Sequence, residues 1–208
     1  PLAAFVYDDV MSQHVLSDSH PMRPVRLQYM NALLRAYGAF NDAGALMVKP
    51  RPATVEELTT FHDEWYVEIV QRLSNGESFS HSQRFGFSDG GDNPIYRGMY
   101  QAAVLSTGAS VQAAELVANG SASVAFAPAG GLHHAMAGHA SGFCIFNDPV
   151  IAINVLREQG KRVVYIDIDA HHGDGVQAAY YEDADVMTIS MHESGRWLFP
   201  GTGDVVEL

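Results

Sequence analysis

The sequence predicts an α/β protein built on an open parallel sheet with helices on both faces. Short apolar runs alternate with longer helical segments, and glycine-rich turns directly follow two of the runs. Runs that are apolar throughout are typical of parallel strands, which are buried on both faces. Their alternation with helices favours a doubly wound sheet. The expected strands are residues 4–7, 124–127, 163–168 and 186–191.

Helical segments separate most of these strands. A break is expected near His62, and Gly160 ends the last helix directly before a strand. Residues 74–93 are rich in Ser, Gly, Asp and Asn without periodicity, so a long surface loop is expected there. No repeat or linker marks a second domain, and residues 1–208 are interpreted as one domain. The expected helices are residues 24–39, 55–71, 95–119 and 148–159.

Composition narrows the function classes. The 208 residues carry 12 basic and 24 acidic side chains, for a net charge of −12. Nucleic acid requires a cationic surface, so its direct binding is not expected. Cys144 is the only cysteine, which excludes an internal disulfide and a thiolate zinc cluster. The sequence contains neither a leader-like N-terminus nor a membrane-length apolar run, so a cytoplasmic protein without membrane contact is expected.

The segment VVYIDIDAHHGDG at residues 163–175 places charged groups where a strand would carry more Val and Ile. Asp167, Asp169 and His171 are two residues apart, so in an extended chain they point to one face. Each residue alone could be a turn former or a satisfied polar group. Burial of the whole cluster is costly without a cation or dense hydrogen bonding. Since Asp and His are typical zinc ligands, the pattern predicts a metal site.

A second motif, GGLHHA, puts His133 and His134 on a loop after the expected strand 124–127. On a loop both rings can approach one pocket. Imidazole titrates near neutral pH, so two histidines held by carboxylates can divide proton transfer and electrostatic stabilisation between them. Asp167 and Asp174 are the available carboxylate partners. The competing interpretation is a helix-entry loop with two incidental histidines.

Taken in order, GGLHHA, ASGFCIFND, VVYIDIDAHHGDG and FPGTGD resemble the motifs of the histone deacetylase family, which includes bacterial acetoin-utilisation and acetylpolyamine-hydrolase relatives. HPMRPVR at residues 20–26 is similar to the N-terminal motif of class I-like members. The resemblance covers essentially the whole chain. It implies an arginase-like α/β fold, a zinc ion, and hydrolysis of an acetylated lysine or polyamine to acetate and a free amine.

The resemblance also implies roles for the two motifs. Asp169 and His171 correspond to the first two zinc ligands, and zinc would polarise the acetyl carbonyl and activate water. His134, paired with Asp174, corresponds to the general base and later acid. His133, paired with Asp167, corresponds to the electrostatic member of the tandem pair.

Five further positions resemble residues that contact the substrate. Phe143 and Phe199 correspond to the aromatic walls of a narrow acyl-lysine tunnel, and Gly142 would allow close approach. Asp92 corresponds to a rim residue that holds the substrate backbone. Arg26 corresponds to an arginine of the inner acetate-release channel. The alternative for the two phenylalanines is a place in the core.

A structural potassium ion beside the zinc is also implied by the family. By resemblance its ligands come from Asp167, Asp169, His171, Ser190 and Met191. A second potassium site would use main-chain oxygens of Tyr180, Asp183 and Val186.

The family's catalytic domain continues well beyond position 208. Its third zinc ligand and its oxyanion tyrosine lie further along, and neither Asp204 nor Glu207 stands at the required place. The chain is therefore expected to be the N-terminal portion of the domain, with impaired zinc binding and hydrolysis. An unpaired sheet edge would favour homo-oligomers. The alternatives are an arginase-like di-metal hydrolase, suggested by Asp-Ala-His at 169–171, and a non-catalytic piece that binds an acetylated ligand or a partner.

Overall fold

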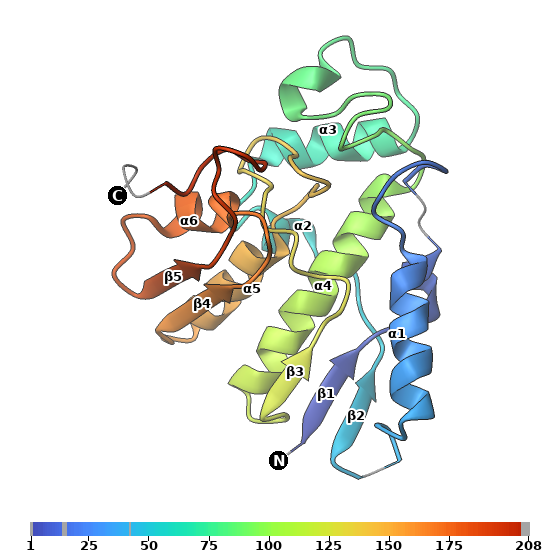
Figure 1. The fold of residues 1–208 in the computed structure, drawn as a ribbon, viewed down its shortest axis with the longest axis vertical. Coiled ribbons are helices and arrows are strands. Elements are labelled where there is room, and N and C mark those ends of the chain that lie inside the picture. The colour runs from blue at the N-terminus through green and yellow to red at the C-terminus, as the bar shows by residue number, and fades with distance from the viewer. Residues whose placement is uncertain (1, 14–15, 42, 205–208) are drawn as a thin grey trace.

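The computed structural model describes residues 2–13, 16–41 and 43–204, and its strands form parallel sheets as the sequence predicts (Figure 1). In the first sheet β1 (Ala3–Val6) lies between β2 (Ala45–Val48) and β3 (Val124–Phe126). In the second, β4 (Val163–Asp167) pairs with β5 (Val186–Ser190). The sequence analysis missed β2, although its four apolar residues form a run as long as the predicted strand at residues 4–7. Glu207 lies outside the described residues.

The four expected helices are present within a few residues of their predicted ends. The break near His62 is confirmed, because the chain leaves the helical path between α2 and α3. The sequence analysis did not predict α6, whose seven residues are too few for a periodic pattern. None of the helices described is long and apolar enough to cross a membrane. The helices are α1 (Val25–Ala36), α2 (Val55–Leu58), α3 (Glu64–Ser74), α4 (Met99–Ala118), α5 (Asp148–Glu158) and α6 (Asp174–Tyr180).

Strand β1 is covered on both faces. Its consecutive residues Ala4, Phe5 and Val6 are all buried, although neighbouring side chains of a strand point to opposite faces. Apolar residues of α1 and α4 pack in the same cluster as Phe5 and Val6. Strand β1 is thus covered on both faces, as expected for a doubly wound fold, whereas Val124 and Phe126 of the neighbouring β3 are 58% and 50% exposed.

The second sheet departs from this expectation, because β4 and β5 are covered on one face only in the described part of the chain. Val163 and Tyr165 pack against a cluster formed by α5, α6 and Val186. Val164, Ile166 and Met187 on the other face are 58–60% exposed. No described element lies over these side chains.

Residues 74–93 are not simply a surface loop. They contain a short 3₁₀ helix (Ser82–Phe85), and Phe87 is fully buried in the main core. The Phe87 ring stacks on Tyr66 of α3, with 6.3 Å between the ring centroids. Polar composition hid this anchor, because one buried aromatic residue is enough to fix a polar segment to the core.

Helix α4 approaches the segment before α2 unusually closely. Ala53 donates its backbone N–H to the Val104 carbonyl at 2.8 Å. At Gly108, one helical turn further on, an added Cβ would overlap the Arg51 carbonyl oxygen and lie 2.6 Å from the Ala53 nitrogen. The contact therefore requires glycine inside a helix, where glycine is otherwise unfavourable.

We expect Gly108→Ala to destabilise the protein by roughly 1–3 kcal/mol, because the new methyl group meets backbone that cannot rotate away. Urea unfolding measures the change. The higher helix propensity of alanine would by itself stabilise the protein by about 1 kcal/mol. A urea midpoint that is unchanged or higher in the variant would therefore show that this close approach is absent.

Candidate active site

The tandem histidines follow β3 on a loop, and each ring contacts a different carboxylate. His133 Nδ1 lies 2.5 Å from Asp167 Oδ2, and His134 Nδ1 lies 2.7 Å from Asp174 Oδ1. Both histidines are buried, and their ring centroids are 4.0 Å apart. The loop thus brings together two imidazole–carboxylate pairs in the combination that the family resemblance implies. In each ring Nε2 remains as the second nitrogen.

Asp167, at the end of β4, binds more than one donor. Besides His133, it accepts the Tyr165 hydroxyl at 2.5 Å and the Asp169 backbone N–H at 3.0 Å. Burial alone would raise the pKa of Asp167, but these hydrogen bonds outweigh it and lower the pKa to about 2. The sequence analysis missed Tyr165, although its position two residues before Asp167 on the same strand face could have indicated it.

The pKa of His133 is affected in the opposite sense. Burial lowers it, but the hydrogen bond to Asp167 and the charge of that carboxylate more than offset the burial. The pKa of His133 therefore lies above the ordinary value, which favours the imidazolium form.

Asp169 and His171 form the predicted metal-ligand pair at the exposed edge of the site. Asp169 Oδ1 lies 2.8 Å from His171 Nδ1, and the His171 ring is 5.8 Å from the His134 ring. Oxygen and nitrogen donors of this kind suit zinc. Among the described residues, however, no three His, Cys, Asp or Glu side chains converge as a metal site. The donors match zinc in type, but two protein ligands are fewer than the three of a usual catalytic site.

Phe143 lies in a tight turn, and Phe199 packs against the His134 ring. Gly142 and Phe143 occupy a tight turn closed by two backbone hydrogen bonds between Ser141 and Cys144, and both have positive φ, 50° and 72°. Such a conformation is costly for phenylalanine and common at functional sites. A Cβ at Gly142 would lie 2.5 Å from the His134 ring. Phe199 contacts that ring edge-on, with 4.9 Å between centroids.

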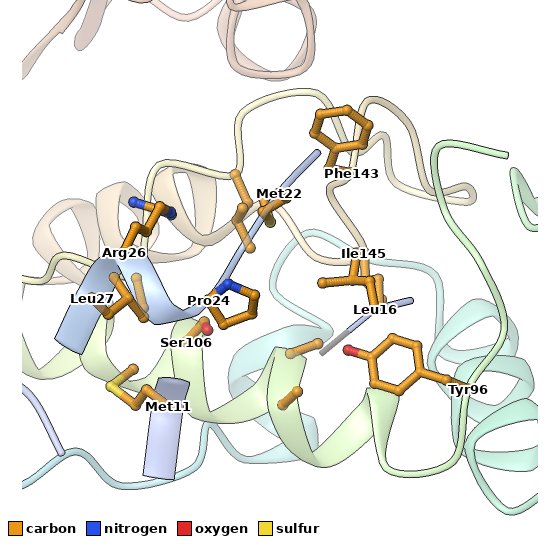
Figure 2. Close-up of a pocket in the computed structure, with 14 residues that line it drawn as sticks. Met11, Leu16, Met22, Pro24, Arg26, Leu27, Tyr96, Ser106, Phe143 and Ile145 are labelled. Carbon is orange, nitrogen blue, oxygen red and sulfur yellow. The ribbon is translucent and has the colours of Figure 1, made fainter. Parts of the chain in front are cut away.

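A cavity of about 80 Å³ lies beside Phe143 (Figure 2). Arg26 and Phe143 line it from different elements, with Met22 between them in this view. Most of its remaining lining is apolar, and Tyr96 and Ser106 add hydroxyl groups. The structure thus places the predicted channel arginine and one tunnel wall along the same hollow.

Asp92 is connected to this region only indirectly. Its side chain is exposed, while its carbonyl oxygen lies 3.1 Å from His20 Nε2. The His20 ring in turn contacts the Phe143 ring edge-on at 4.6 Å. His20 was not singled out from the sequence, although it begins the HPMRPVR motif. The predicted rim residue Asp92 is therefore linked to the predicted tunnel wall Phe143 through the buried His20.

The residues expected to bind potassium lie in two places. Asp167 and Ser190 are register partners at the ends of β4 and β5, and Met191 donates its N–H to the Asp167 carbonyl at 2.9 Å. At the other position, the Asp183 N–H donates to the Tyr180 carbonyl and the Val186 N–H donates to the Asp183 carbonyl. These contacts bring Asp167, Ser190 and Met191 together in one place and Tyr180, Asp183 and Val186 in another. Both potassium sites remain predictions.

Asp148 is a buried carboxylate near the site that the sequence analysis did not identify. It is 1% exposed and accepts hydrogen bonds from Ser110 Oγ (2.5 Å), Gly131 N–H (3.0 Å) and Leu132 N–H (2.8 Å). Burial raises the pKa of Asp148, and these donors partly offset that effect. Asp148 thereby holds the glycine-rich turn that leads into His133.

Comparison with known proteins gives one consistent family. The model of the histone deacetylase domain matches residues 20–208. The chain is 40% identical over 207 residues to the acetoin utilization protein AcuC of Bacillus subtilis (strain 168), covering 99% of this chain and 53% of that protein. It is 39% identical over 205 residues to histone deacetylase 2 of Oryza sativa subsp. japonica, covering 98% of this chain and 40% of that protein.

Solved structures agree with these relatives. A histone deacetylase homologue from Aquifex aeolicus superposes with a TM-score of 0.90 at 34% identity, covering 100% of this chain and 55% of that one. A histone deacetylase homologue complexed with SAHA gives a TM-score of 0.87 at 35% identity, covering 99% of this chain and 55% of that one. The chain thus has the fold of these homologues. It spans 53% and 40% of the length of the two curated relatives.

We expect Asp167→Asn to lower the pKa of His133 in metal-free protein, because the asparagine oxygen can keep the hydrogen bond while the charge that offsets burial is lost. NMR titration of the His133 ring measures the pKa. Asp174→Asn is the matched control and should lower it less, since Asp174 contributes the smallest of the charge effects. Equal shifts in the two variants would contradict the assigned pairing.

Proposed function

Because the chain belongs to the histone deacetylase family, we propose that it carries the proton-transfer groups and two of the metal ligands for zinc-dependent hydrolysis of an acetylated amine. The substrate class is acetyl-lysine or an acetylpolyamine. The observation that carries this proposal is the position of His134, whose ring contacts Asp174 and also lies 5.8 Å from the ring of the candidate ligand His171. Since the chain spans about half of its curated relatives, the activity of the whole protein is part of the proposal.

His134 is the proposed general base and later acid. Its Nδ1 is held by Asp174 Oδ1, so Nε2 is the atom that can take a proton from water and later pass it to the leaving amine. Asp174 fixes the ring's orientation and stabilises the imidazolium formed after proton uptake. The edge-on contact with Phe199 limits rotation of the same ring.

His133 is the proposed electrostatic partner. Its raised pKa favours a positive charge beside the reacting group, where negative charge develops on the acetyl oxygen. A group that is already charged serves poorly as a base. His133 is therefore better suited to stabilising charge than to accepting a proton.

Asp169 and His171 would hold zinc, which when bound would polarise the acetyl carbonyl and lower the pKa of water. Asp169 Oδ1 also accepts the backbone N–H of His171, a bond that fixes the two donors relative to each other. A third ligand from outside the described residues is part of this proposal, because those residues supply two.

Phe143 and Phe199 are the proposed walls for the methylene chain of the substrate, and Arg26 belongs to the inner hollow beside them. A histone deacetylase homologue that is 35% identical to this chain has been solved in complex with SAHA, which supports ligand binding by a protein of this fold. Aromatic walls and family membership favour this function over an arginase-like one, since a guanidino substrate needs no aromatic tube.

Three further assignments belong to the same proposal. A structural potassium ion would lie near Asp167 and Ser190, and a second one near Tyr180, Asp183 and Val186. The described residues would form part of one deacetylase domain. The outer strand edges of β3 and β4, unpaired within the described residues, would allow association with a second copy.

We expect His134→Ala to lower kcat by about 10²–10⁴ with a much smaller change in KM, because a general base acts mainly in the transition state. The assay measures acetate release from an acetyl-lysine peptide by a longer protein that contains these residues. His139→Ala, which changes an exposed histidine of the same region, is the control. A His134→Ala enzyme with unchanged kcat would remove His134 from the mechanism.

The polypeptide of residues 1–208 should retain less than one zinc ion per chain after dialysis against a mild chelator, because its described residues supply two ligands. His171→Ala should abolish the remaining binding, and His139→Ala should not change it. Metal analysis of the dialysed proteins provides the measurement. Stoichiometric zinc in the dialysed 208-residue protein would mean that its own residues complete the site.

A further inference from the structure

A buried histidine outside the proposed catalytic set lies at the junction between α2 and α3. His62 is 2% exposed and packs among the rings of Phe61, Tyr66 and Phe146, at centroid distances of 4.8, 5.6 and 5.1 Å. Its hydrogen-bond and ring contacts include neither Asp169 and His171 nor the tandem histidines. Its hydrogen bonds nevertheless lead to the loop that carries His133 and His134.

The partners of His62 fix its protonation state. Nδ1 lies 3.2 Å from the Ala137 carbonyl oxygen, which can only accept, so Nδ1 carries the proton. Nε2 accepts the backbone N–H of Asn147 at 2.9 Å and must be unprotonated. Both bonds therefore require one neutral tautomer. Burial lowers the pKa of His62 to about 4, in agreement with a ring that stays neutral at physiological pH.

Asn147 continues the connection with its side chain. It is fully buried, and its Nδ2 donates to the carbonyl oxygens of His133 at 3.1 Å and Ala135 at 2.9 Å. Its Oδ1 accepts the Val150 N–H and caps α5. The Asn147 amide thus holds the backbone on both sides of His134 by hydrogen bonds.

Further contacts leave this backbone little freedom. The Asp63 N–H also donates to the Ala137 carbonyl, at 3.0 Å, so two neighbouring residues hold the same oxygen. An added Cβ at Gly175 of α6 would lie 2.5 Å from the His133 carbonyl oxygen and 2.7 Å from Asn147 Nδ2. Helix α6, which begins with the His134 partner Asp174, therefore packs directly on the segment that Asn147 holds.

We propose that His62 is a positioning residue that acts through Asn147 to set the orientation of the His133 and His134 rings. The inference rests on the proposed function for the roles of those two histidines, but its structural content is separate. Accepting the Asn147 N–H holds Asn147 in place. The Asn147 amide then fixes the carbonyls of His133 and Ala135, and with them the two short imidazole–carboxylate contacts.

Two substitutions separate the two hydrogen bonds of His62. In H62Q the Gln oxygen can take the place of Nε2 and still accept the Asn147 N–H. In H62N the Asn amide nitrogen can take the place of Nδ1 and still donate to Ala137, but the Asn147 N–H is left without an acceptor. Tyr66→Phe is the matched control, because it removes another buried hydrogen bond, from the Tyr66 hydroxyl to the Ile145 carbonyl at 2.8 Å, without touching Asn147.

The readout is the set of downfield proton resonances of the His133 and His134 Nδ1–H groups in metal-free 208-residue protein. They are assigned by their loss in H133Q and H134Q. We expect H62Q and Tyr66→Phe to keep the wild-type resonances, and H62N to shift or lose them. Should H62N fail to fold, N147S replaces it, because serine still caps α5 but lacks the amide donors to His133 and Ala135.

Unchanged resonances in H62N or N147S would overturn the proposal. So would an equal loss in H62Q, or in Tyr66→Phe, since each would mean that packing rather than the Asn147 link matters. These spectra need neither substrate nor metal. Absence of hydrolysis in a longer protein would refute the proposed function while leaving the resonance pattern intact, so the two failures are distinguishable.

Discussion

A carboxylate taken out of water is stable only where donors replace its hydration, and Asp167 meets this requirement at the end of β4. Three donors reach it: an imidazole, a phenol and a backbone N–H. Because each donor comes from a different position, the carboxylate ties the tandem-histidine loop to β4 and to the turn that follows. Gly173 lies so close that an added Cβ would overlap Asp167 Oδ2. The arrangement of the whole site depends on this one charge being satisfied.

The site therefore has a rigid part and an open part. The two imidazole–carboxylate pairs are buried and held by several elements, whereas the side chains of Asp169 and His171 are 53% and 40% exposed. If these pairs act in proton transfer as proposed, no further free energy is needed to orient them during the reaction. The metal-ligand pair is fixed mainly by its own local turn, in which the His171 N–H and ring both contact Asp169.

Sequence patterns predicted the features that have a period or a motif. The strands 163–168 and 186–191 and the break near His62 were found within a few residues. The two His–Asp pairs that the family resemblance implied are in contact. The short elements β2 and α6 were missed. Single residues that act through long-range contacts, such as Phe87, were also missed, because nothing in the neighbouring sequence marks their partners.

The one-sided covering of β4 has a consequence for how the molecule opens. Local unfolding requires the least free energy where buried apolar contacts are fewest, and β1 is enclosed on both faces while β4 is enclosed on one. Amide hydrogens of β4 and β5 in this polypeptide should therefore exchange with solvent sooner than those of β1. Asp169 and His171 follow β4 directly, so the proposed metal-ligand turn adjoins the sheet that opens first. Whatever covers Val164, Ile166 and Met187 would slow that exchange and, through β4, steady the metal-ligand turn.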